Sequence, residues 1–383
     1  MNGTALHHLA SEKSCRDTEY RGMNPVRLLA FATPGAGGVE ETHLRGLLEN
    51  FRADIFPFDR RAKMRTFLGL LDAIRRGDHD LIVMEGSGIA GGAAVLLGRL
   101  LFGARYVVSS GDAVGPFVAM RWPLLAPIFS LYERLLCRAA SGFIGRTPYL
   151  AGRALGFGSP RAMTAAGWAP FEYAPGTLAR SRDRIREKLG IPADGLVAGI
   201  VGTLIWTKSV GYCYGLELVE AVRRCDRANV YALIIGEGDG RTRLERVAGD
   251  ELGAKIIFTG SVPHDQVPHY LAAMDIASLP QSVDRVGSFR YTTKLSEYLA
   301  AGLPVITGQI PLAYDLDEGW LWRLPGSAPW DERYIDALAK LIARVDAREL
   351  MSKRRAALSR MREFDRDRQV ARVTEFINEL LFE

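Results

Sequence analysis

Residues 290–308, which read RYTTKLSEYLAAGLPVITG, predict a short helix followed by a buried strand. Thr292, Thr293 and Lys294 stand at the start of the helix, a Gly-Leu-Pro sequence ends it, and an apolar run follows. The free N–H groups and positive dipole end of a helix, together with a lysine, favour binding of an anion such as phosphate. Glu297 lies one turn further on the face of Thr293, where a carboxylate can accept hydrogen bonds from vicinal hydroxyls. The pattern is typical of a helix that binds a ribose diphosphate, and also of an ordinary capped helix in an α/β domain.

Length and composition indicate two α/β domains. The chain has 383 residues, of which 48% are hydrophobic and 24% charged, and it contains 40 glycines. This is the profile of a globular protein that is too long for one typical core. The formal net charge of +5 predicts a mildly basic surface, which suits anionic substrates or anionic lipid surfaces.

The cysteines and histidines give no sign of a disulfide framework or a metal centre. The four cysteines have neither close pairing nor metal-ligand spacing, which predicts reduced thiols in a cytoplasmic protein without a bound metal. His264 and His269 lie in a polar turn, where surface or capping roles are expected. No signal peptide opens the chain, and residues 1–24 are expected to be a disordered tail.

One uncharged stretch within residues 118–136, WPLLAPIFSLY, raises the question of membrane contact. It is too short to span a bilayer, and Pro123 and Pro127 interrupt it. Two interpretations stay open: a core or interdomain helix, or a helix at a bilayer interface whose neighbouring arginines meet anionic headgroups (Arg121, Arg134 and Arg138).

Strands and helices alternate along the chain in two series. The alternation predicts parallel sheets covered by helices on both faces. The expected strands of the first series are residues 26–33, 80–84, 104–109 and 142–145, and those of the second are 196–201, 229–235, 255–258 and 275–279. A polar stretch, 170–183, is expected to be the linker between them, and 331–382 to be three charged helices. The predicted domains are therefore 25–172 and 184–350, followed by C-terminal helices over 351–383.

Glycine-rich turns follow several of the expected strands. Residues 34–38, which include Gly37 and Gly38, follow the first strand, and Gly202-Thr203 follow the strand at 196–201. Ligands of parallel sheets bind at the carboxyl ends of the strands, so two such edges facing each other would form a binding cleft. Lys208 lies a few residues past Gly202 and could reach a phosphate.

The second half resembles glycosyltransferases of the GT-B fold, specifically family 4, also called glycosyl transferases group 1. The resemblance rests on four segments in the family's order: GIVGTLIWTKSVG (199–211), ALIIGEGDGRTRLE (232–245), IIFTGSVPHDQVPHYLAAMDIASLPQ (256–281) and KLSEYLAAGLPVI (294–306). In the first half, PGAGGVEETHLRGLL (34–48) resembles the family's N-terminal glycine loop. The resemblance implies two Rossmann-like domains across a cleft, with a last helix, around 366–382, that crosses back onto the first domain.

The resemblance also implies retaining transfer of a sugar from a nucleoside-diphosphate sugar to an acceptor hydroxyl, without a metal or another cofactor. On this basis the leaving diphosphate would be stabilised by helix N–H groups and cations, and Glu297 would hold the ribose. The base would lie near Gly236, Gly238 and Val262. The residues expected to bind the donor are Gly37, Gly38, Gly202, Thr203, Lys208, Gly236, Gly238, Val262, Arg290, Thr292, Thr293, Lys294 and Glu297, and those expected in catalysis are Asp112, Lys208 and Lys294.

Three positions depart from the family's pattern. Phe289 stands where many members have an acidic residue eight positions before the ribose glutamate, so that Asp284 or Arg290 would have to replace part of its role. Thr203 stands where a basic residue often follows the phosphate-loop glycine. Asp112 stands roughly where a histidine is often found, and either orients or deprotonates the acceptor or caps the next helix.

Other functions stay open at this point. Residues 86–91, GSGIAG, match a dinucleotide fingerprint, with Asp112 at a suitable distance beyond it, as in an NAD(P)- or flavin-binding oxidoreductase. A nucleotide-sugar 2-epimerase of the same fold and a non-catalytic binding subunit are further alternatives. For the transferase, we expect a glycan or lipid-linked acceptor in cell-surface polysaccharide or glycolipid synthesis. We expect a cytoplasmic location at the inner face of the membrane, peripheral contact with anionic lipid, and no nucleic acid partner.

Overall fold

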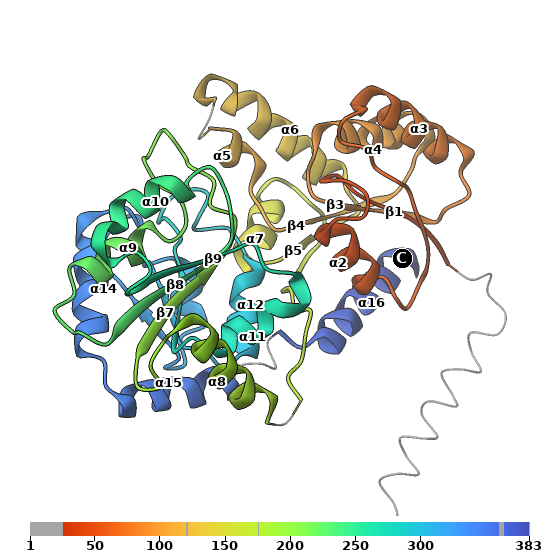
Figure 1. The fold of residues 1–383 in the computed structure, drawn as a ribbon. Coiled ribbons are helices and arrows are strands. Elements are labelled where there is room, and N and C mark those ends of the chain that lie inside the picture. The colour runs from red at the N-terminus through yellow and green to blue at the C-terminus, as the bar shows by residue number, and fades with distance from the viewer. Residues whose placement is uncertain (1–25, 120–121, 175, 360–363, 383) are drawn as a thin grey trace, which may run out of the picture.

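Two parallel six-stranded sheets form the centre of the computed structural model, which describes residues 26–119, 122–174, 176–359 and 364–382 (Figure 1). The N-terminal sheet has the order β2-β1-β3-β4-β5-β6 and the C-terminal sheet the order β12-β11-β10-β7-β8-β9. All strand pairs within the two sheets are parallel. The predicted α/β class with two parallel sheets is therefore confirmed. The expected tail at residues 1–24 lies outside the described residues.

The N-terminal sheet is built from buried apolar strands, each followed by a helix. Its strands are β1 (Arg27–Ala32), β2 (Arg52–Ile55), β3 (Leu81–Glu85), β4 (Tyr106–Ser110), β5 (Gly142–Gly145) and β6 (Ala162–Thr164). Its helices are α2 (Val39–Leu47), α3 (Lys63–Arg76), α4 (Ile89–Phe102), α5 (Val114–Ala119), the 3₁₀ turn η2 (Pro123–Leu125), α6 (Ala126–Ala139) and α7 (Pro148–Gly156). Side chains of α3, α4, α6 and α7 share one core with strands of this sheet, and those of α2 share a second core with them.

The C-terminal sheet repeats this arrangement. Its strands are β7 (Leu196–Val201), β8 (Val230–Ile235), β9 (Ile256–Gly260), β10 (Ile276–Leu279), β11 (Val305–Thr307) and β12 (Leu321–Arg323). Its helices are α8 (Thr177–Leu189), α9 (Leu216–Arg223), α10 (Arg241–Ala248), η3 (Gly249–Glu251), η4 (His264–Gln266), α11 (Val267–Ala272), α12 (Thr293–Ala300), α13 (Pro311–Asp315), α14 (Glu332–Arg344) and α15 (Ala347–Ser359). Two cores line the sheet, one with α9, α10 and α14, the other with α8, α11, α12 and α15.

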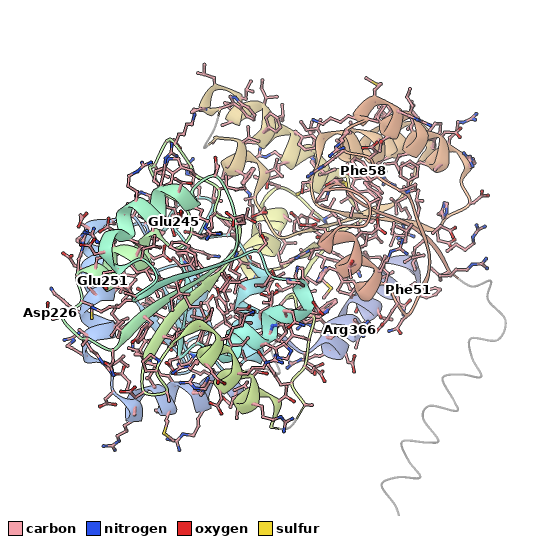
Figure 2. All side chains as sticks on the ribbon, viewed as in Figure 1. Phe51, Phe58, Asp226, Glu245, Glu251 and Arg366 are labelled. Atoms are coloured by element: carbon pink, nitrogen blue, oxygen red, sulfur yellow. The ribbon has the colours of Figure 1, made fainter. Side chains whose placement is uncertain are left out.

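The last helix, α16 (Arg366–Phe382), packs against the N-terminal sheet. Val373, Phe376 and Ile377 join the core that contains α2, and Arg366 pairs with Glu49 beyond the end of α2 (Figures 1 and 2). With the helices α14, α15 and α16, the prediction of three helices over 331–382 is confirmed. We propose that each sheet and its helices form a domain. Because α8 and α15 contribute to a core of the C-terminal sheet, its domain extends beyond the predicted 184–350 at both ends, to include these two helices.

The predicted linker at 170–183 is wrong in its second half, because α8 begins at Thr177. Residues 177–183 look polar because α8, to which they belong, makes two of its contacts through charged side chains. Arg182 and Arg186 each bond a different carboxylate oxygen of Asp275 at 2.7 Å, and Arg186 is almost completely buried. A hydropathy pattern does not detect a helix that is fixed by buried arginines, since buried charges require partners supplied from elsewhere in the chain. The short strands β2, β6 and β12 were also not predicted.

Candidate functional site

The start of α12 lies where the sequence pattern places it. Thr292 is the N-cap residue with an extended backbone, and its side chain makes no capping hydrogen bond. Its Oγ1 is buried and, among the described residues, has no hydrogen-bond partner. A buried hydroxyl normally finds a partner, so this atom is free to bond a ligand or water at the helix start.

Lys294, in the first turn of α12, extends to the loop that follows β7. Its ammonium lies 4.5 Å from the centre of the Tyr214 ring. A Cβ built on Gly202 would stand 3.3 Å from Lys294 Nζ and 3.0 Å from its Cε. The absence of a side chain at Gly202 therefore makes room for the lysine, and the structure brings together two residues that the sequence analysis placed at the phosphate.

Glu297 occupies the next turn of α12 and is only 8% exposed. Burial raises the pKa of its carboxyl, and the nearby positive charges of Lys294 and His264 oppose that rise. Within the described part of the chain, no hydrogen bond to its side chain is present. A desolvated carboxylate without a partner is poised to accept hydrogen bonds from a ligand.

Gly236 and Gly238 are required by the packing of their own loop. Gly236 has φ +147°, and a Cβ there would stand 1.9 Å from the carbonyl oxygen of Gly202. A Cβ on Gly238 would stand 2.3 Å from the carbonyl oxygen of Leu204. These glycines let the loops after β7 and β8 pack in direct backbone contact, and their expected contact with a base stays a prediction.

In the described structure, no hydrogen bond or ion pair with α12 is made by Lys208, Thr203, Gly37 or Gly38. Lys208 and Thr203 are exposed, and Lys208 lies in a tight turn closed by the hydrogen bond from Thr207 N to Tyr212 O (2.8 Å). Gly37 has φ +73° with open space around its Cβ position, and Gly38 is the N-cap of α2. Their roles stay predictions.

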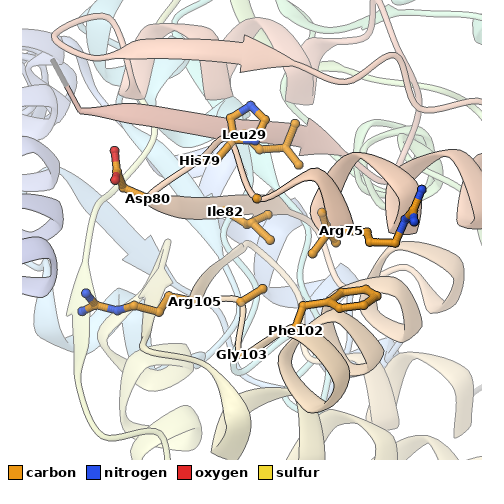
Figure 3. Close-up of a pocket in the computed structure, with 11 residues that line it drawn as sticks. Leu29, Arg75, His79, Asp80, Ile82, Phe102, Gly103 and Arg105 are labelled. Atoms are coloured by element: carbon orange, nitrogen blue, oxygen red, sulfur yellow. The ribbon is translucent and has the colours of Figure 1, made fainter. Parts of the chain in front are cut away.

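Val262 follows β9 and lines a cavity of about 360 Å³. Arg184 and Lys188 of α8 and Gln266 and Tyr270 beyond β9 also line it. A second cavity, of about 270 Å³, lies at the amino ends of β3 and β4 in the N-terminal sheet, where Asp80 and Arg105 precede these strands (Figure 3). None of the predicted site residues lines this second cavity.

The two domains meet at the loop that leads into α12. Tyr291 N donates to Gly111 O at 3.3 Å, and Thr147 Oγ1 donates to Phe289 O at 2.9 Å. Arg290 Nε pairs with Asp112 Oδ1 at 3.0 Å. The loops after β4 and β5 thus contact the loop after β10, so the carboxyl ends of both sheets meet at one seam.

Asp112 pairs across this seam and does not cap α5. The helix starts at Val114, and the carboxylate that accepts a hydrogen bond from its first turn is Glu133, from Gly115 N at 3.1 Å. Glu133 is also held by Arg153 Nε and Nη2 at 2.9 and 2.8 Å. The capping alternative for Asp112 is therefore not supported, which leaves its expected catalytic role as a prediction.

The position of Phe289 explains why an acidic residue is absent there. Its side chain packs against the core of the N-terminal domain, and the Arg153 guanidinium lies 5.5 Å from its ring centre. Asp284, one candidate to replace the acid, accepts hydrogen bonds from Val286 N (2.8 Å) and Gly287 N (2.9 Å) and so closes its own turn. Arg290, the other candidate, is paired with Asp112.

A buried polar cluster near the seam was missed by the sequence analysis. Glu85, at the end of β3, bonds Arg146, after β5, at 2.6 Å, and both are almost completely buried. His43 Nδ1 lies 3.4 Å from Arg146 Nη2, and its ring stacks on Trp168 at 4.4 Å between ring centres. Burial, and secondarily the Arg146 charge, lower the pKa of His43 well below its ordinary value, so its imidazole is neutral. Glu85 Oε2, Arg146 Nε and His43 Nε2 have no partner in the described structure.

The glycines of the dinucleotide-like fingerprint serve packing against β1 and its end. A Cβ on Gly86 would stand 2.6 Å from Thr33 Oγ1, and one on Gly91 would stand 2.7 Å from Phe31 Cε2. Gly88 N, at the start of α4, already donates to Thr33 Oγ1 at 3.1 Å. A side chain of this protein thus occupies a donor that a pyrophosphate would need, which removes the basis of the oxidoreductase alternative.

Comparison with known proteins agrees with the C-terminal half of this site. Residues 195–344 match the model of the family described as glycosyl transferases group 1. This range, which includes β7 to α14, is a glycosyl transferases group 1 domain. The family predicted from the sequence is therefore confirmed over these residues.

Individual relatives share shorter stretches. A 2-deoxystreptamine glucosyltransferase of Streptomyces kanamyceticus is 28% identical over 125 residues, which are 32% of this chain and 30% of that protein. A Bacillus subtilis protein named as a teichuronic acid biosynthesis glycosyltransferase, TuaC, is 31% identical over 126 residues, 33% of this chain and 28% of that protein. The matches thus span less than a third of these curated relatives' own length.

The described part of the chain has the GT-B fold. The crystal structure of Anabaena HepE in complex with UDP superposes with a TM-score of 0.71 over 92% of this chain and 100% of that chain, at 15% identity. At such low identity the likeness shows the fold alone. It includes both sheets, so the first half, which resembled the family only through residues 34–48, shares the architecture as well.

Proposed function

We propose that this protein is a retaining, metal-independent glycosyltransferase that moves a sugar from a nucleoside-diphosphate sugar to an acceptor hydroxyl. One observation carries the proposal: Lys294, at the start of α12, lies against Gly202. One turn away lies the buried Glu297 carboxylate, which has no hydrogen-bond partner among the described residues. A cation and helix N–H groups suit a diphosphate, and a buried carboxylate suits the ribose hydroxyls beside it.

Breaking the bond between the sugar and the diphosphate moves negative charge onto the leaving phosphate oxygens. On this proposal, the Lys294 ammonium and the free N–H groups at the start of α12 stabilise that charge as it develops. The Thr292 hydroxyl, buried without a partner, supplies a further hydrogen bond to the same group. We propose the exposed Lys208, in the loop that follows β7, as a second cation for the diphosphate.

The Asp112–Arg290 pair bridges the seam, and Arg290 lies two residues before Thr292, the N-cap of α12. We propose that Asp112 orients the acceptor hydroxyl while Arg290 holds the carboxylate in place and adds positive charge near the leaving group. The departing phosphate can take the acceptor proton, so Asp112 need not act as a base in this scheme.

The acceptor and the cellular setting are proposed from weaker support. TuaC is named for teichuronic acid biosynthesis, and the Streptomyces protein for glucosyl transfer to 2-deoxystreptamine. We propose a glycan or lipid-linked acceptor in cell-surface polysaccharide or glycolipid synthesis at the inner face of a membrane.

Thermal unfolding of the full chain with UDP, GDP, ADP, dTDP or NADH, each with and without EDTA, tests the proposal. One nucleoside diphosphate should raise the unfolding midpoint, because a ligand at 100 times its dissociation constant adds about 2.7 kcal/mol to the free energy of unfolding. The shift should be lost in Lys294→Ala. A shift with NADH alone, or one that EDTA abolishes, would overturn the proposal.

Enzymatic turnover separates the transferase from its alternatives. Slow release of nucleoside diphosphate from the matching nucleotide sugar without acceptor supports a transferase and argues against a pure binding subunit. Formation of the 2-epimeric sugar without acceptor would instead assign the protein to the epimerases.

A further inference from the structure

Helix α6 is apolar on both of its faces. Its inner face carries Leu136 and Cys137, which are buried in the core of the N-terminal domain. Its outer face carries Ile128, Leu131 and Leu135, at the three- and four-residue spacing of one helical stripe. A surface helix of a globular domain normally has polar residues on the side away from the core, so this outer stripe needs an explanation.

The stripe is exposed and continues beyond the helix. Ile128, Leu131 and Leu135 are 63%, 57% and 49% exposed, and Leu124 in the preceding turn η2 is 93% exposed. Phe117 on α5, which packs against α6, is 49% exposed. Single exposed leucines are common on protein surfaces, whereas a continuous apolar stripe marks a binding surface.

The charges around the stripe are positive. Between Gly86 and Ala140 the sequence contains five arginines and only two acidic residues, Asp112 and Glu133. Asp112 is paired with Arg290, and Glu133 is buried and paired with Arg153. Arg134 and Arg138 are exposed on α6 itself. Arginine side chains beside exposed apolar groups suit a bilayer surface, where the chain lies along the apolar layer and the guanidinium meets lipid phosphate.

The neighbouring helices extend the same type of surface. Helices α3, α4 and α6 belong to one layer on the N-terminal sheet and lie along its upper edge in Figure 1. Leu100 on α4 and Met64 on α3 are 79% and 70% exposed, and basic residues accompany them on these helices (Lys63, Arg65 and Arg99). The acidic residue of α3, Asp72, is paired with Arg75 and Arg76. The surface begins two residues after Asp112, since α5 starts at Val114.

We propose that η2 and the outer face of α6, together with α5, bind an anionic lipid bilayer. The leucine and isoleucine side chains enter the boundary between headgroups and acyl chains, while Arg134 and Arg138 contact lipid phosphate. Charge complementarity selects this occupant, because α6 exposes Arg134 and Arg138 beside the stripe and the two acidic residues between Gly86 and Ala140 are both paired. The contact is peripheral: among the described residues, no helix combines the length and the apolar run that a bilayer crossing requires.

Sedimentation of the full chain with phosphatidylcholine vesicles, with and without phosphatidylglycerol, tests this proposal. Binding should require phosphatidylglycerol and weaken with salt. Ile128→Asp/Leu131→Asp should abolish it, and Arg134→Gln/Arg138→Gln should weaken it about thirtyfold. Met351→Asp, at a position 62% exposed on α15 in the other domain, is the matched control and should bind as the parent does.

The replaced side chains are exposed, so the variants should unfold at the same temperature as the parent. Unchanged vesicle binding in Ile128→Asp/Leu131→Asp would overturn the proposal. It would also be overturned if the parent bound no vesicles, or formed a dimer that this variant lost, which would assign the stripe to a second copy of the chain. Vesicle binding needs no donor nucleotide, so this result is independent of the proposed transferase activity.

Discussion

Replacing Glu297 by alanine separates a ribose-binding carboxylate from one that is merely structural. The side chain is 8% exposed, its pKa is raised by burial, and it has no hydrogen-bond partner in the described structure. A buried carboxylate without a partner does not stabilise the unliganded fold. We therefore expect Glu297→Ala to unfold at the same temperature as the parent, or slightly higher, without ligand.

Ligand affinity should change much more. A hydrogen bond to a charged group contributes about 1.5–3 kcal/mol. The carboxylate is already desolvated, so binding adds little new desolvation cost, and two ribose hydroxyls at the lower value give about 3 kcal/mol. That free energy corresponds to roughly a 150-fold weaker affinity for the nucleoside diphosphate. Burial raises the pKa of Glu297 above 4.5, the ordinary pKa of glutamate. As the pH is lowered, the affinity of the parent for the nucleoside diphosphate should therefore begin to fall at a pH above 4.5.

Calorimetric titration with the nucleoside diphosphate and its 2′-deoxy analogue makes the test specific. The parent should discriminate between the two by about tenfold, the value of one such bond. Glu297→Ala should bind both equally weakly, and Glu375→Ala, an exposed glutamate on α16, should behave as the parent. Discrimination that survives in Glu297→Ala would refute the ribose assignment.

Three further predictions concern the fold that supports the site. Gly236→Ala should lower the free energy of unfolding in urea by more than about 3 kcal/mol, because its Cβ would stand 1.9 Å from a backbone oxygen at φ +147°. The control Gly253→Ala, at φ +76° in open space, should lower it by only about 1–2 kcal/mol. Equal losses in the two variants would contradict the steric argument. Arg146→Ala should cost about 3–5 kcal/mol because it leaves Glu85 buried without its partner, and Glu85→Gln in the same chain should recover part of that loss in thermal unfolding. Burial raises the pKa of Glu217, so its contribution to stability is largest below pH 4.5 and falls as the pH rises through the raised pKa. The stability of Glu217→Gln relative to the parent should therefore increase over that pH range. A stability difference that does not change with pH would contradict this prediction.

The sequence was most informative where local patterns suffice. The strands at β1, β3 and β8 are continuous apolar runs, and α12 has a polar start and a glycine after its end. Such patterns depend on residues a few positions apart, since the helical and strand periods are short. The ordered segments between 199 and 306 then indicated the family.

Local sequence patterns do not predict contacts between segments that are distant in the chain. Helix α8 was not predicted because its arginines pair with Asp275, which lies some 90 positions later in the chain. The roles of Gly236 and of the fingerprint glycines depend on which backbone or side chain fills the space beside them. A glycine gives the same local signal whether a phosphate or a neighbouring loop approaches it.

The sequence by itself determined the two α/β series, the helix that begins at Thr293 and the family of residues 195–344. Only the tertiary structure decided that Asp112 pairs with Arg290 across the seam and that Phe289 packs against the core of the opposite domain. It also showed that α6 buries Leu136 and Cys137 and leaves a second apolar stripe, with Ile128, Leu131 and Leu135, exposed to solvent. Hydrophobic periodicity records that a helix has an apolar stripe, but burial depends on what the rest of the chain places against it.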